Sequence, residues 1–123
     1  MAEFKVLLVD DEEEYVRTLA ERLEMRGLNV SVVLSGDRAI RTVQEAPPDV
    51  MVLDLKMPGM DGMSVLSRVK MIAPQVQVII LTGHGSQKDE EVARRLGVFD
   101  YLQKPVDIAV LLKTMERAYG SPA

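Results

Sequence analysis

The chain has 123 residues, a formal net charge of −4, no cysteine and an aromatic content of 4%. This length suits one domain, and the charge and scarce aromatic residues argue against nucleic-acid binding through a basic face or stacking platform. Lack of cysteine excludes disulfides, thiol chemistry and cysteine-bound zinc. No apolar run approaches the ~18 residues of a membrane span. Because the first residues also lack the features of a signal peptide, we expect a cytoplasmic protein without membrane contact.

Short apolar runs alternate with amphipathic helical patterns along the chain. The strand-like runs are residues 4–9, 28–34, 50–53, 76–81 and 98–102. Such alternation is typical of βα units on a parallel sheet. With right-handed crossovers it predicts an α/β fold: a doubly wound, flavodoxin-like (βα)5 domain with a five-stranded parallel sheet in the order 2-1-3-4-5.

Five helices are predicted to follow these strands. The residues expected to cap the first four are Asp11, Ser35, Asp61 and Ser86. The residues expected to stop them are Gly27, Pro47, Pro74 and Gly97. The fifth helix is expected from about Asp107 to Tyr119, with residues 120–123 as a frayed end or the start of a linker. The fourth helix has the smallest apolar face, so we expect it to be held weakly.

Polar residues occur where the carboxyl ends of the predicted strands would meet. They are Asp10 and Asp11 after the first strand, Asp54 after the third, Thr82 after the fourth and Lys104 shortly after the fifth. In open α/β sheets this edge is where ligands bind. Three carboxylates held together repel one another, so at least one of their pKa values should be raised. A divalent cation such as Mg²⁺ would relieve the repulsion.

These residue types suit phosphoryl transfer. Asp54 is the best candidate nucleophile, because a carboxylate can attack a phosphoryl group and form an aspartyl phosphate. Lys104 can pair with one phosphoryl oxygen, and the Thr82 hydroxyl can hydrogen-bond another. Taken singly, a lysine such as Lys104 is usually a solvated surface residue, and a threonine after a strand, such as Thr82, is usually a turn or cap residue. The interpretation therefore rests on their joint placement.

The motifs at these positions resemble those of the receiver domain of two-component response regulators. They are Asp10-Asp11, the segment 54–62, Thr82-Gly83, Tyr101 and Lys104-Pro105. The resemblance covers residues 1–123 as a single receiver domain. It implies that Asp54 accepts a phosphoryl group from a phosphohistidine of a sensor histidine kinase, as a stoichiometric acceptor rather than an enzyme. It also implies that Asp54, Asp11 and the Lys56 backbone carbonyl bind Mg²⁺, and that Asp10 acts through a coordinated water.

A conformational switch is also implied by the resemblance. Thr82 would move toward the phosphoryl group, and Tyr101 would move into the vacated space. The surface of the fourth helix, fifth strand and fifth helix would then change, to control a downstream protein or output domain, or to form a homodimer. The bond between Lys104 and Pro105 would be cis and direct the ammonium group into the site.

Two further positions would tune the lifetime of the aspartyl phosphate in this family. Lys56 follows Asp54 by two residues, and His84 follows Thr82 by two. Lys56 would attract the phosphoryl group or obstruct water. His84 would order water, although a solvent-facing loop histidine explains it equally well.

Other functions share parts of this pattern. A receiver-like binding module that works without phosphorylation is the main alternative, but every acidic, hydroxyl and lysine position is intact. A magnesium-dependent phosphatase would carry a second aspartate where this chain has Lys56. An FMN carrier would need a Ser/Thr/Gly-rich loop after the first strand, where this chain is acidic over residues 10–14. A Mg²⁺-dependent phosphoacceptor signalling switch is therefore the main hypothesis.

Overall fold

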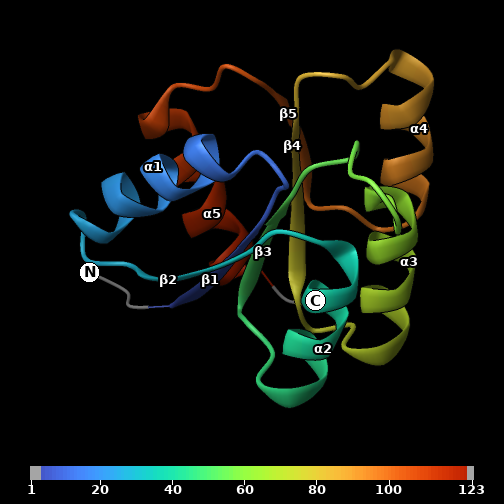
Figure 1. Ribbon diagram of the computed structural model, residues 1–123, viewed down its shortest axis with the longest axis horizontal. Helices are drawn as coiled ribbons and strands as arrows, with labels where there is room; N and C mark the ends of the chain where they lie inside the picture. Colours follow the sequence, from blue (N-terminus) through green and yellow to red (C-terminus); the bar gives the residue numbers. More distant parts are fainter. Residues whose placement is uncertain (1–3, 122–123) are drawn as a thin grey trace.

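Five parallel strands form one sheet in the order β2-β1-β3-β4-β5 in the computed structural model, which describes residues 4–121 (Figure 1). The strands are β1 (Lys5–Val9), β2 (Asn29–Val33), β3 (Val50–Leu53), β4 (Gln77–Thr82) and β5 (Asp100–Gln103). The helices are α1 (Glu13–Glu24), α2 (Gly36–Glu45), α3 (Gly62–Ile72), α4 (Gln87–Arg95) and α5 (Ile108–Gly120). The predicted α/β fold and strand order are confirmed.

Helices cover both faces of the sheet. α1 and α5 lie on one face, and α2, α3 and α4 on the other (Figure 1). Side chains alternate along β1, so that Val6 and Leu8 pack with α1 and α5 while Leu7 and Val9 pack on the opposite side. The central strands β3 and β4 are buried along their whole length, as parallel strands covered on both faces must be. No helix within residues 4–121 is long and apolar enough to span a membrane.

Side-chain caps begin three helices as predicted. The cap residues are Ser35, Asp61 and Ser86, and Asp89 completes a capping box with Ser86. Each accepts a hydrogen bond from a backbone N–H that has no partner within the first turn of its helix. Gly27 and Gly97 follow α1 and α4 with φ angles of +88° and +97°, a backbone conformation that ends a helix and favours glycine.

The predicted cap of the first helix was wrong. Glu12, not Asp11, is the N-cap residue of α1, and no side chain makes a capping hydrogen bond there. The reason is that the Asp10 carboxylate accepts a hydrogen bond from the backbone N–H of Glu12 (3.0 Å). This turn carries the chain past Asp11 before the helix starts. Glu13 and Glu14 then lie in the first turn, where negative charge complements the helix dipole.

Several predicted strand and helix boundaries also shift by one or two residues. β5 begins at Asp100 rather than at Val98, because the Val98 N–H donates to the Ala93 carbonyl (3.1 Å) at the end of α4. The end of α4 therefore uses the Val98 N–H, which a strand would need for pairing with its neighbour. α5 continues through Gly120, so the predicted frayed end at 120–123 starts too early, and residues 122–123 lie outside the described part of the chain.

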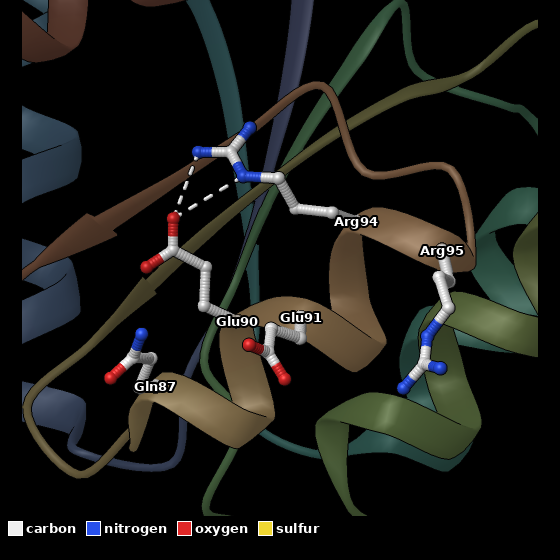
Figure 2. Close-up of a pocket in the computed structure, with 5 residues that line it drawn as sticks. All are labelled: Gln87, Glu90, Glu91, Arg94 and Arg95. Carbon is white, nitrogen blue, oxygen red and sulfur yellow. Dashed lines mark hydrogen bonds and ion pairs between the residues drawn. The ribbon is translucent and has the colours of Figure 1, made fainter.

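α4 has few contacts with the core, as the sequence predicts. Of its nine residues, all described, Ala93 alone is fully buried. Figure 2 shows its outer face, where charged side chains line a surface hollow. There Arg94 pairs with Glu90 and with Asp100 of β5, both at 3.1 Å. Exposed ion pairs contribute less than about 1 kcal/mol each, so α4 is held lightly.

Close packing of α3 against the end of β3 provides a test of the fold. A Cβ on Gly62 would collide with the Asp54 carbonyl oxygen and lie 2.6 Å from Leu55 Cα. Backbone atoms cannot turn aside, so we expect Gly62→Ala to lower the free energy of unfolding by about 2 kcal/mol in urea denaturation. The control is Gly120→Ala, where no atom lies within 4 Å; it should leave stability unchanged or slightly higher. Equal free energies of unfolding for Gly62→Ala and Gly120→Ala would contradict the close packing at Gly62.

Candidate functional site

Backbone hydrogen bonds continue the sheet past the strand ends and fix the candidate site residues. Asp10 donates its N–H to the last residue of β2 (3.2 Å), and Asp54 to the last residue of β1 (2.9 Å). Lys104 donates its N–H to the Thr82 carbonyl (3.0 Å). Main-chain pairing thus holds Asp10, Asp54 and Lys104, which follow β1, β3 and β5, at one edge of the sheet together with Thr82 at the end of β4. The structure brings Asp10, Asp54 and Lys104 together there, as predicted from the sequence.

Two carboxylates are buried at this edge. Asp10 is 5% exposed and Asp54 is 2% exposed. An exposed third carboxylate, that of Glu12, joins them, and one oxygen from each lies within 4.8 Å of the others. Burial raises the pKa of Asp10, although hydrogen bonds from Lys104 and from the Glu12 backbone oppose this, and the charge of Asp54 adds to the rise. The predicted rise is confirmed for Asp10, with burial rather than repulsion as its main cause.

The Lys104 ammonium group bridges all three carboxylates. From Nζ the distances are 2.7 Å to Asp10 Oδ2, 2.6 Å to Glu12 Oε1 and 3.5 Å to Asp54 Oδ2. The Tyr15 ring also lies against this group, with its centroid 4.5 Å from Nζ, a cation–π distance. Burial alone would lower the pKa of Lys104, but hydrogen bonds to Asp10 and Glu12 outweigh it and raise that pKa. The lysine therefore stays charged and balances the buried carboxylates.

Asp11 lies apart from this carboxylate cluster. Its side chain is exposed and makes no hydrogen bond or ion pair with residues 4–121. Glu12 occupies the cluster, although the sequence indicated it only as part of an acidic run. The long-range pair with Lys104, 92 residues away, gave no local signal. Lys56 has an exposed side chain, and its backbone N–H lies 3.5 Å from Asp54 Oδ1.

The two predicted switch residues lie beside the loop between β4 and α4. Thr82 is the last residue of β4 and is fully buried. Its Oγ1 accepts a hydrogen bond from the backbone N–H of His84 (3.2 Å), whose side chain is exposed. Tyr101 is 7% exposed and points inward, and its hydroxyl has no hydrogen-bond partner within residues 4–121. The bond between Lys104 and Pro105 is cis, the geometry that the family resemblance implies.

The donor set at this edge fits magnesium. Carboxylate oxygens from two buried residues and one exposed residue lie close enough to share a cation. Mg²⁺ prefers oxygen ligands, with one or two carboxylates and several waters completing an octahedron. The positive charge of Mg²⁺ would also stabilise the ionised Asp10 carboxylate and so oppose the rise in its pKa that burial causes.

Comparison with known proteins identifies the family. The "Response regulator receiver domain" family matches residues 6–116. The chain belongs to this family. Its members are signalling domains of two-component systems rather than classical enzymes, and phosphorylation and Mg²⁺ binding at the acidic pocket are general among them.

Individual relatives agree with this assignment. The chain is 37% identical over 118 residues to the transcriptional regulatory protein GlrR of Escherichia coli K12, and 35% identical over 113 residues to NtrC of Salmonella typhimurium. These matches cover 96% and 92% of the chain but 27% and 24% of those proteins. The chain thus spans about a quarter of their length. Both relatives are longer regulators in which the matched region is one part.

Solved receiver domains superimpose over nearly the whole chain. One from Clostridium thermocellum has a TM-score of 0.89 and 36% identity, covering 94% of each chain. FixJ-N has a TM-score of 0.90 and 30% identity, and covers 100% of this chain and 98% of FixJ-N. A CheY-like domain from Methanospirillum hungatei, at 22% identity and a TM-score of 0.92, shows the same fold.

Asp10 allows a test of what burial does to the site. Its folded-state pKa is raised above the ordinary 3.8, so its charge destabilises the fold at neutral pH, and this effect disappears as pH falls through the folded pKa. Asp10→Asn removes the charge and keeps one oxygen acceptor, which can serve either the Glu12 N–H, now bonded to Oδ1, or Lys104, now bonded to Oδ2. We expect it to raise the free energy of unfolding in Mg²⁺-free buffer at neutral pH by about 1 kcal/mol.

The measurement is urea denaturation at neutral and mildly acidic pH. The advantage of Asp10→Asn should shrink in acid, where wild-type Asp10 becomes protonated. A variant less stable than wild type at neutral pH would contradict the effect assigned to burial.

Proposed function

We propose that this receiver domain is a Mg²⁺-dependent phosphoacceptor switch in which Asp54 receives the phosphoryl group. The observation that carries the proposal is the Asp54 carboxylate, 2% exposed at the sheet edge and 3.5 Å from Lys104 Nζ. Phosphoryl transfer depends mainly on positioning and charge neutralisation. A fixed carboxylate beside a fixed cation supplies both. Asp10, bonded to the same lysine, completes the charged surroundings.

The proposed transfer is a displacement at phosphorus. An Asp54 oxygen attacks the phosphorus, the bond from phosphorus to the donor imidazole nitrogen breaks, and its electron pair returns to the imidazole. Lys104 would exchange its carboxylate partners for a phosphoryl oxygen, and the Thr82 hydroxyl would donate to another. Water later hydrolyses the aspartyl phosphate and restores the carboxylate. The domain is then a self-catalysing acceptor that stores a signal.

The proposed metal ligands are Asp54, Asp11 and the Lys56 backbone carbonyl, with Asp10 acting through water. When bound, Mg²⁺ would neutralise phosphoryl and carboxylate oxygens. Asp11 has no competing partner within residues 4–121, whereas Glu12 is held by Lys104 at 2.6 Å. The Lys56 backbone N–H donates to Asp54 Oδ1 at 3.5 Å, which places this residue's main chain near the proposed site. These observations support Asp11 over Glu12.

Matched substitutions at neighbouring positions test these ligands. Asp11→Asn and Glu12→Gln each remove one negative charge from the same turn, so their long-range electrostatic effects are similar. We expect Asp11→Asn to weaken Mg²⁺ binding about tenfold or more, equivalent to about 1.4 kcal/mol, and Glu12→Gln to change it far less. Titration calorimetry measures both affinities. The reverse order would assign the metal to Asp10, Glu12 and Asp54.

The proposed phosphoryl donor is a sensor histidine kinase. A groove beside the site supports this, because it runs from Tyr15 and Leu19 of α1 to Pro105 and Val106 after β5. Its apolar lining, with Arg22 among the polar groups, suits an amphipathic helix of a donor. Because the donor is a two-component kinase, the proposal places this exchange in the cytoplasm.

The proposed output is a change in the surface of α4, β5 and α5. Thr82 Oγ1 accepts a hydrogen bond from His84 N–H, so its movement toward a phosphoryl group would free the loop that leads into α4. α4 has few buried residues, so displacing it should cost less free energy than displacing the other helices. The altered surface would act on a downstream protein, an output domain or a second copy of the chain.

The central experiment is incubation with acetyl phosphate and Mg²⁺, followed by intact-mass measurement. Wild type should gain the mass of one phosphoryl group, and chelation of Mg²⁺ should abolish the gain. Asp54→Asn, which keeps the size of the side chain but removes the nucleophilic charge, should gain nothing. Lack of an adduct on wild type would favour a phosphorylation-independent binding module, and an adduct on Asp54→Asn would place the acceptor elsewhere.

A further inference from the structure

Gly85, in the loop between β4 and α4, lies against both switch residues. A Cβ built on Gly85 would collide with the Tyr101 hydroxyl oxygen, lie 2.8 Å from Tyr101 Cζ and lie 3.0 Å from Thr82 Cγ2. Non-bonded carbon atoms do not approach so closely. The inward position of the Tyr101 ring therefore occupies the space that any side chain at residue 85 would take.

Hydrogen bonding does not hold Tyr101 in this position. Its hydroxyl is buried and has no partner within residues 4–121, which opposes burial of the side chain. What favours the inward position is the packing of the ring, which belongs to the apolar core on the α2, α3 and α4 side of the sheet. A position that rests on packing alone depends on whether neighbouring atoms leave room. Gly85 leaves this room for the Tyr101 ring because it has no side chain.

The two glycines of this loop differ in this respect. A Cβ on Gly83 would meet only Lys104 Cβ and Cδ, at 3.8 and 3.9 Å, which are ordinary contact distances. Neither glycine has a positive φ angle, so alanine is compatible with the backbone at both positions. The effect of a methyl group on Tyr101 is therefore specific to Gly85, and Gly83 offers a matched control.

We propose that Gly85 is a positioning residue of the switch: its lack of a side chain allows Tyr101 to lie inward beside Thr82. A methyl group at residue 85 displaces the end of a side chain that can rotate about χ1, not the backbone. The expected response is rotation of Tyr101 outward to solvent, with the fold retained.

Phosphorylation should respond to the same residue. This step rests on the proposed function, in which the inward position of Tyr101 accompanies phosphorylation of Asp54. Because the phosphorylated site favours the inward ring in that proposal, a change that lowers the population of the inward ring must weaken binding of a phosphoryl group or its analogue in proportion to that fall. Beryllium trifluoride bound with Mg²⁺ at Asp54 serves as that analogue. We expect about fivefold or greater weakening in Gly85→Ala, within the usual range of such couplings.

The first experiment observes the ring directly. NMR spectra of protein with ring-labelled tyrosine contain signals from Tyr15, Tyr101 and Tyr119, and Tyr101→Phe assigns one of them. A soluble paramagnetic reagent should broaden the Tyr101 signal in Gly85→Ala but not in wild type or Gly83→Ala. Equal protection of Tyr101 in all three proteins would overturn the proposal, whether or not Asp54 is phosphorylated.

A second experiment tests whether Gly85 acts through Tyr101. In a Tyr101→Leu background, Gly85→Ala should lose most of its effect on the affinity for beryllium trifluoride, because the Tyr101 hydroxyl oxygen and Cζ are gone while the 3.0 Å contact with Thr82 Cγ2 remains. An undiminished effect there would mean that Gly85 acts by another route and would overturn the proposal. If Gly85→Ala alone fails to fold, the double variant must restore folding, and failure to do so has the same meaning. Absence of binding by wild type would instead refute the proposed function and leave the ring measurement valid.

Discussion

Main-chain pairing beyond the strand ends is the constraint on which the site depends. Asp10, Asp54 and Lys104 each donate a backbone N–H to a neighbouring strand just outside the regular ladder. Their Cα positions are therefore set by the sheet itself, whose core is apolar on both faces. Side chains whose backbone positions are fixed need little reorganisation before a reaction. Such positioning is the main requirement of phosphoryl transfer. The loops beyond these residues remain free to vary.

Charge balance is the second requirement, because the fixed positions bring carboxylates into a buried region. Lys104 meets it by bonding to Asp10 and Glu12 and lying near Asp54. A phosphoryl group or a cation entering the site must therefore rearrange this lysine as well as the carboxylates. In the proposed function, the same residue that stabilises the resting site would then bind the incoming phosphoryl group. Tyr15, whose ring lies against the ammonium group, helps to define where it rests.

The sequence was sufficient to predict the strand order, three of the helix caps and the meeting of Asp10, Asp54 and Lys104. These follow from local patterns and from the geometry of parallel sheets. It was not sufficient for the start of α1, because a carboxylate beside a strand can cap a helix or bond to the next turn, and only the folded environment decides. Nor could it identify Glu12 as the partner of Lys104, since flexible side chains far apart in sequence leave no periodic signal. The inward position of the Tyr101 ring depends on packing against Gly85. No sequence pattern predicts that contact either.

Burial of Asp10 has a consequence for how such domains evolve. Burial makes its charge unfavourable to the folded state, although the hydrogen bond from Lys104 opposes this, so selection for signalling explains this acidic residue better than selection for stability does. A duplicated gene released from that selection would drift toward neutral residues at this edge while its sheet and helices persisted. The surface of α4, β5 and α5 would survive such drift. Receiver-like domains that bind partners without phosphate are thus the expected descendants of a chain like this one.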